Sequence, residues 1–187
     1  MKNQMEYGQI IGINKSENSF GDIDLQSPPL MRLFIDEIKQ MYWAEEELVK
    51  AIPKMIGMAT SENLIISLTN HLEETKFHFE RLEEIFEMLD EKPVAVKCET
   101  MDDLLKEAEY TMDASEQGAT RNSGIISAAQ KVEHYEIATY AMLSQYAKTL
   151  GLVEVTDMLE QTLEEEKAAE KKLVEIAKSS INIPAVN

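Results

Sequence analysis

Glutamate residues interrupt otherwise apolar stripes, at helical spacing, in separate segments of this chain. Glu133 and Glu136 lie three residues apart in one stripe, and Glu45 and Glu166 each interrupt another. Residues three or four apart share one face of a helix, so these carboxylates point inward with their apolar neighbours. An unpaired buried carboxylate costs roughly several kcal/mol, and the stripes carry no lysine or arginine at this height. The pattern therefore indicates carboxylates that are neutralised by bound metal ions.

A further segment supplies imidazole. Its stripe contains His71 and His78, with Glu74 flanking both at helical spacing. Two divalent cations bring a charge of about +4, which balances four carboxylates, and imidazole completes the coordination. Carboxylates with one or two histidines favour iron or manganese over zinc or calcium. The spacing leaves open whether His71, His78 or both are ligands, and Glu170 is one more candidate on the last stripe.

Counting outward from the turns places these groups in one layer. In an antiparallel hairpin, residues equally far from the turn lie side by side. With a turn near residue 151, Glu136 faces Glu166 and Glu133 faces the residue before Glu170. With a turn near residue 60, Glu45 faces the middle of segment 74–78. A lone glutamate is more often a solvated surface residue, but four at one height favour a common site.

The elements that position these residues are helices. Only seven glycines and five prolines interrupt the chain, and the stretches between them alternate apolar and charged residues at helical spacing. The pattern predicts an all-α protein with a short helix after an N-cap at Thr100, a helix stop at Gly151 and an N-cap at Ser27. Long helices are predicted over residues 27–59, 62–89, 122–150 and 152–179.

The loop lengths predict the topology. The first two long helices are joined by almost nothing, as are the last two, so each pair must form an antiparallel hairpin. The roughly 30-residue connection between the pairs is long enough to cross the length of a bundle. The sequence thus predicts a ferritin-like four-helix bundle over 27–180, preceded by a flexible arm at 1–26 and followed by a tail at 181–187.

Composition excludes several classes of partner. The 187 residues suit one domain, and 44% hydrophobic content is enough for a buried core. The formal net charge of -17 repels nucleic acid and anionic membranes. The single cysteine, Cys98, cannot form an intramolecular disulfide, and the polar N-terminal segment lacks the apolar core of a signal peptide. We therefore expect a cytoplasmic protein, and we assign Cys98 no chemistry.

Over residues 30–180 the chain resembles the YciE/YciF family of bacterial stress proteins, within the ferritin-like superfamily that includes rubrerythrins. The segments that carry the resemblance are LFIDEIKQMYWAEEEL, HLEETKFHFERLEEIFE, AAQKVEHYEIATYAML and LEQTLEEEKAAEKKL. The resemblance implies a four-helix bundle with a dinuclear metal motif, assembled as a homodimer, and the family is often labelled ferroxidase. The second segment departs from the usual Glu-x-x-His pattern by reading His71-x-x-Glu74, and Glu170 stands where a histidine often lies.

Taken together, the sequence predicts a stress protein that binds two iron ions, or manganese, and oxidises Fe(II) with dioxygen or peroxide. Glu45, Glu136 and Glu166 are the expected catalytic ligands, since carboxylates that bridge two metals let both ions share one oxidant. The alternatives are a bundle that carries metal in a structural or binding role without turnover, and a storage cage. The complete predicted ligand set is Glu45, His71, Glu74, His78, Glu133, Glu136, Glu166 and Glu170.

Overall fold

A computed structural model describes residues 28–180 of the chain, all of them in helices or short connections. The helices are α2 (Pro29–Met58), α3 (Glu62–Met88), α4 (Glu99–Ala114), α5 (Ala119–Leu150) and α6 (Val153–Ser180). The predicted arm at 1–26 and tail at 181–187 lie outside the described residues.

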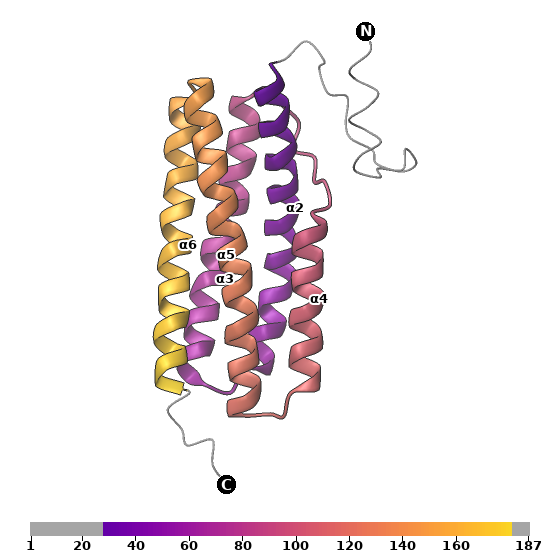
Figure 1. Cartoon of the computed structure of the whole chain (residues 1–187), viewed down its shortest axis with the longest axis vertical. Coiled ribbons are helices and arrows are strands. Elements are labelled where there is room, and N and C mark those ends of the chain that lie inside the picture. The colour runs from indigo at the N-terminus through magenta and orange to yellow at the C-terminus, as the bar shows by residue number, and fades with distance from the viewer. Residues whose placement is uncertain (1–27, 181–187) are drawn as a thin grey trace, which may run out of the picture.

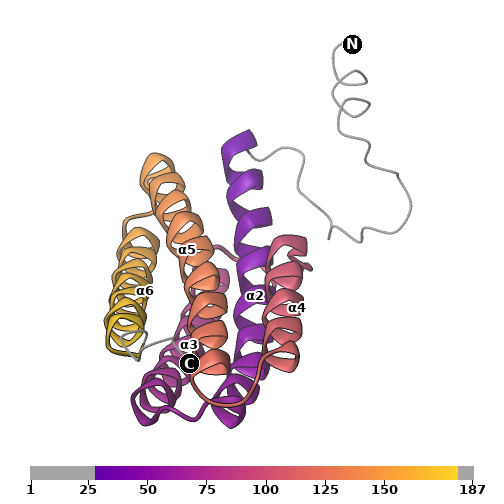
Figure 2. The ribbon, with the colours of Figure 1, turned by 60° about the horizontal axis from the view of Figure 1, so that its bottom comes forward.

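The helices form the predicted all-α bundle. The four long helices lie nearly parallel to the long axis of the molecule (Figure 1). Short turns join α2 to α3 and α5 to α6, so each pair is an antiparallel hairpin. The connection between the hairpins contains α4, which packs against α5 and α2 on the outside of the bundle (Figure 2). No helix within residues 28–180 has the length and hydropathy needed to cross a membrane.

The helix starts differ from the sequence prediction at three places. Helix α4 begins at Glu99, and its N-cap is Cys98, whose sulfur accepts a hydrogen bond from the Met101 backbone N–H at 3.4 Å. The prediction of a Thr100 cap was wrong because a hydroxyl is the usual acceptor at this position, whereas here a buried thiol replaces it. Helix α5 begins at Ala119, three residues early. Helix α2 begins at Pro29 with Pro28 as its N-cap, whereas the cap was predicted at Ser27, which lies outside the described residues.

The turns set the register of the bundle. Gly151 adopts a left-handed conformation with φ 77°, and its N–H bonds to the Lys148 carbonyl, which ends α5 as predicted. Asn122 ties the start of α5 to the α2–α3 turn. Its Oδ1 accepts from the Thr60 backbone N–H at 2.9 Å, and its Nδ2 donates to Thr60 Oγ1 at 3.0 Å. This pair of bonds fixes the two hairpins relative to each other at one end.

We expect Asn122→Ala to lower the free energy of unfolding by about 1–2 kcal/mol, because the change leaves the Thr60 N–H without its partner at a packed end of the bundle. Urea unfolding measures this loss. The neighbouring Ser123→Ala is the matched control, since Ser123 is bonded only within its own helix and its loss should change stability by less than about 0.5 kcal/mol. Equal stability of the two variants would contradict the role given to Asn122.

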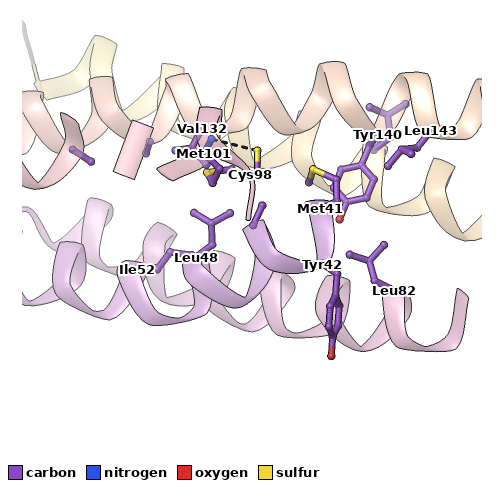
Figure 3. Close-up of a cluster of buried hydrophobic side chains, with 14 of the residues drawn as sticks. Met41, Tyr42, Leu48, Ile52, Leu82, Cys98, Met101, Val132, Tyr140 and Leu143 are labelled. Atoms are coloured by element: carbon purple, nitrogen blue, oxygen red, sulfur yellow. Dashed lines mark hydrogen bonds between the residues drawn. The ribbon is translucent and has the colours of Figure 1, made fainter. Parts of the chain in front are cut away.

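The hydrophobic core fills the space between the four long helices. Phe34, Ile38 and Met41 are fully buried on α2. Figure 3 shows Tyr140 reaching from α5 toward Met41, while Tyr42 points away on the other side of α2. Tyr42 stacks on Phe79 with ring centroids 4.5 Å apart. The same inward faces also bury acidic and imidazole side chains, which is unusual for a core of this kind.

Candidate metal centre

Six acidic and imidazole side chains lie buried at mid-height in the bundle, and every long helix supplies at least one. Helix α2 gives one glutamate, α3 two histidines, α5 two glutamates and α6 one glutamate. None is more than 7% exposed. The six are Glu45, His71, His78, Glu133, Glu136 and Glu166.

These side chains form two groups that share one member. In the first, which we call the His71 subsite, atoms of His71, Glu133, Glu136 and Glu166 all lie within 4.8 Å of one another. In the second, the His78 subsite, atoms of Glu45, His78 and Glu166 do so. Glu166 belongs to both, so its two oxygens can bridge two ions. The described part of the chain therefore brings together donor atoms that could hold two metal ions.

Short distances within the groups show how the donor atoms converge. His71 Nε2 lies 3.2 Å from Glu133 Oε1. His78 Nδ1 lies 2.8 Å from Glu166 Oε1 and 3.7 Å from Glu45 Oε1. The Tyr140 hydroxyl, itself fully buried, donates a hydrogen bond to Glu45 Oε1. That bond orients the Glu45 carboxylate and leaves its second oxygen free to bind a ligand.

The strongest indication that this cluster binds cations is a set of buried polar atoms without ordinary hydrogen bonds. Within residues 28–180, eight buried side-chain nitrogen and oxygen atoms lack a hydrogen bond of ordinary geometry, and all eight belong to the six residues above. Two of them, His78 Nδ1 and Glu166 Oε1, contact each other as an ion pair at 2.8 Å. Both oxygens of Glu136 and both of Glu166 are among the eight. Buried polar groups are nearly always hydrogen-bonded, so a cluster of exceptions needs a ligand that accepts lone pairs. Divalent cations have that property.

Two of the predicted ligands lie outside both groups. The Glu74 side chain is 39% exposed, and its Oε2 is 3.8 Å from His71 Nδ1. Glu170 is partly exposed on α6, next to the buried Ala169. The structure thus brings together six of the eight predicted residues and leaves these two at the edge of the site.

The charges of the site perturb one another. Burial, reinforced by repulsion from Glu166, raises the pKa of Glu133 and of Glu136 well above the usual carboxyl value. Burial also raises the pKa of Glu45 to about 7. Burial lowers the pKa of His78, but Glu166, Glu45 and Glu165 outweigh that effect and raise it to about 9. Without metal, protons supply the positive charge that this layer needs.

We expect the metal-free protein to lose stability between about pH 5 and pH 9. Glu45, Glu133, Glu136 and His78 hold their protons more tightly in the folded chain than in the unfolded one, so these protons stabilise the fold at low pH. That stabilisation is lost as the pH rises through the raised pKa values. The pKa of Glu166 is lowered, because His78 and His71 outweigh the effect of burial. Protonation of Glu166 therefore affects the stability of the fold only at more acidic pH.

Thermal unfolding in the presence of a chelator checks this expectation. The midpoint should fall by roughly 5 °C or more across the range, and excess Mn²⁺ should reverse the trend because ligands bind metal in their deprotonated forms. A metal-free midpoint that rises with pH across the same window would contradict it.

Two contributors outside the donor set, Glu165 and Arg81, were missed by sequence analysis. Glu165 Oε2 lies 3.0 Å from His78 Nε2, on the ring edge opposite the subsite. Arg81 pairs with Glu165 and also donates to Thr162 Oγ1. Glu165 stands in a run of three glutamates at 164–166, a pattern typical of a solvated face, but its side chain is only 31% exposed. The one available signal was the position of Arg81, one turn after His78 on the same helix.

The fold and the buried donor set define a ferritin-like four-helix bundle with a candidate dinuclear metal centre. Comparison with known proteins agrees with the helical bundle. The chain belongs to the family described as Domain of unknown function (DUF892), whose model matches residues 30–185.

Among its relatives is protein YciF of Escherichia coli strain K12, which is 36% identical over 156 residues, covering 83% of this chain and 94% of YciF. The crystal structure of the E. coli stress protein YciF superposes with a TM-score of 0.80, at 35% identity, covering 84% of this chain and 99% of that one. The structure of YcfI from Rhodopseudomonas palustris gives a TM-score of 0.77 at 40% identity, covering 83% and 98%. The match to the YciE/YciF family predicted from the sequence is confirmed.

Proposed function

We propose that this chain is a stress protein that binds two iron ions, with manganese as the other candidate metal, and oxidises Fe(II) with dioxygen or peroxide. The observation that carries the proposal is the cluster of eight unsatisfied donor atoms, because two divalent cations supply both the charge and the lone-pair acceptors that these atoms lack. The relation to a protein named as a stress protein supports the physiological setting.

The donor chemistry fits iron. Four carboxylates and two imidazoles offer hard oxygen and intermediate nitrogen donors, a mixture typical of iron and manganese centres, whereas zinc and copper sites favour sulfur or more imidazole. Glu45 and His78 would hold one ion, His71, Glu133 and Glu136 the other, and Glu166 both. When bound, the metal pair supplies two one-electron redox centres that can act on one oxidant.

The chain's own residues prepare the site for that reaction. The carboxylates stabilise the more highly charged Fe(III) product over Fe(II), which favours electron loss. Burial in the bundle excludes bulk water, and Tyr140 fixes the position of Glu45. As substrate, two Fe(II) ions give up one electron each. The electron pair reduces dioxygen to hydrogen peroxide, or peroxide to water, with two protons taken up in either case.

Anaerobic Fe(II) titration followed by exposure to air tests the proposal. Wild-type protein should bind two irons per chain and then develop near-ultraviolet ferric absorbance faster than buffer alone. Glu136→Ala should lose at least one iron, whereas Glu164→Gln should match wild type because Glu164 is exposed and pairs with Lys167. Binding without accelerated oxidation would instead identify a bundle that carries metal without turnover. Saturation far from two irons per chain would remove the proposal altogether.

We further propose that the protein works in the cytoplasm as a homodimer. A size measurement in solution tests the assembly. A dimer would have about twice the chain mass of 21.2 kDa, and a storage cage would be many times larger.

A further inference from the structure

The two ring nitrogens of His78 face different surroundings. Nδ1 points into the bundle, 2.8 Å from Glu166 Oε1 and 3.7 Å from Glu45 Oε1. Nε2 points the other way, 3.0 Å from Glu165 Oε2. A carboxylate at Nε2 holds the ring proton there, so the lone pair of the neutral ring lies on Nδ1, facing the subsite. Glu165 thus orients the His78 ring so that Nδ1 is available as a metal ligand.

Glu165 is itself held in place by several donors. Arg81 Nη1 lies 2.9 Å from Glu165 Oε2, and Arg81 Nη2 lies 3.4 Å from Oε1. Gln161 Nε2 donates to Oε1 at 2.8 Å. Arg81 also donates to Thr162 Oγ1, and Thr162 is almost completely buried. A two-pronged arginine contact with a carboxylate is stronger and more directional than a single bond, so Glu165 has little freedom to leave His78.

His71 has no such support. Its Nε2 faces Glu133 at 3.2 Å, but its buried Nδ1 has no hydrogen-bond partner, and Glu74, the nearest carboxylate on that edge, lies 3.8 Å away. Glu74 is also more exposed than Glu165. The two subsites therefore differ in how firmly their histidines are positioned before any ion binds. Ordering a ligand during binding costs free energy, so the better ordered subsite binds more tightly.

We propose that Glu165, clamped by Arg81, is a positioning residue that presents His78 Nδ1 to a divalent cation, so that the His78 subsite fills before the His71 subsite. The inference rests on the proposed function only in requiring that the chain bind two cations. It does not depend on iron or on turnover, and it assigns the two ions unequal affinities.

Calorimetric titration of the metal-free full chain with Mn²⁺ tests this order. Wild-type protein should show two steps. Glu165→Ala should weaken the first step by about 10–100-fold and leave the second nearly unchanged, as is typical when the outer partner of a metal-binding histidine is removed. Glu165→Gln keeps an acceptor for the Nε2 proton and should restore much of the loss. Arg81→Ala should weaken the first step less than Glu165→Ala. The neighbouring Glu164→Ala is the matched control and should bind as wild type.

Nitrogen-15 NMR of the histidine rings reports the protonation and metal binding of each ring nitrogen. These signals would not change if Glu165 had a purely structural role. The chain has three histidines, and exposed His134, bonded to its own helix, is an internal reference. With one equivalent of Zn²⁺, the His78 ring should show metal at Nδ1 and a protected proton at Nε2, and His71 should stay unbound. In Glu165→Ala, protection of the Nε2 proton should be lost.

The outcomes separate this inference from the proposed function. A wild-type chain that takes up no Mn²⁺ contradicts both. Two-step binding by wild type, together with an unchanged first step in folded Glu165→Ala, contradicts only the positioning role. The first equivalent of Zn²⁺ binding at His71 would overturn the order of filling. If Glu165→Ala does not fold, Arg81→Ala gives the test in the same direction, because it removes the arginine that holds Glu165 and leaves Glu165 itself in place.

Discussion

Glu136→Leu is expected to stabilise the metal-free protein by about 1–3 kcal/mol and to reduce its stabilisation by metal, because Glu136 belongs to the His71 subsite alone. Glu136 is fully buried, and neither of its carboxylate oxygens has a hydrogen-bond partner, so its polar group is desolvated without compensation. Leucine has a similar volume and no polar atom, and replacing buried charges with apolar side chains often raises stability. A residue that weakens the apo fold is expected where the fold is shaped for a ligand.

Urea unfolding at pH 7 measures both halves of this prediction. With chelator present, Glu136→Leu should unfold at a higher urea concentration than wild type. With excess Mn²⁺ the order should reverse, because the wild type gains the free energy of binding two ions, whereas the variant keeps only the ion of the His78 subsite. The exposed Glu164→Leu is a control for the added apolar side chain and should respond to Mn²⁺ as wild type does. A Glu136→Leu protein that is less stable than wild type without metal would mean that Glu136 is a structural residue.

Glu166→Ala is expected to have the largest effect on metal content, because Glu166 is the one residue common to both subsites. Its loss removes a donor from each ion and the negative charge between them. We expect both affinities to fall by at least about 100-fold, since each ion loses a charged ligand rather than an outer partner. His71→Ala should differ in kind, since it removes a donor from one subsite and should leave one ion per chain bound.

Equilibrium dialysis against Mn²⁺, followed by elemental analysis, distinguishes these variants. The expected order is two ions for wild type, one for His71→Ala and none for Glu166→Ala at the same free metal concentration. Two ions bound to Glu166→Ala would show that the carboxylate does not bridge, and the shared site would then be wrong.

Helical spacing was sufficient to predict the fold and most of the buried cluster of carboxylates and imidazoles. Glu45, Glu133, Glu136 and Glu166 were predicted to face inward because each replaces an apolar residue in a stripe, and all four are buried. The Gly151 turn predicted the pairing of Glu136 with Glu166, and both now belong to one group of converging donors. The prediction worked because backbone periodicity decides which residues share a face.

The edges of the site depend on side chains, which periodicity does not place. Thr75 occupies the buried seam of α3 between His71 and His78, so Glu74 is rotated by about 100° from it and is partly exposed. On α6, Ala169 occupies the buried seam, so the adjacent Glu170 is likewise rotated away from it. Glu165 and Arg81 occupy positions that flank the buried stripes, and their long side chains reach inward from there. The pattern of apolar and charged residues alone predicts that such positions lie on the surface. The start of α4 at Glu99 depends on a buried thiol that is not an ordinary N-cap.

Anomalous diffraction from crystals of the full chain grown with Mn²⁺ tests the central claim most directly. We expect two peaks of anomalous density inside the bundle, one among Glu45, His78 and Glu166 and the other among His71, Glu133, Glu136 and Glu166. An interior without anomalous density at saturating Mn²⁺, with ions only on the acidic surface, would contradict it.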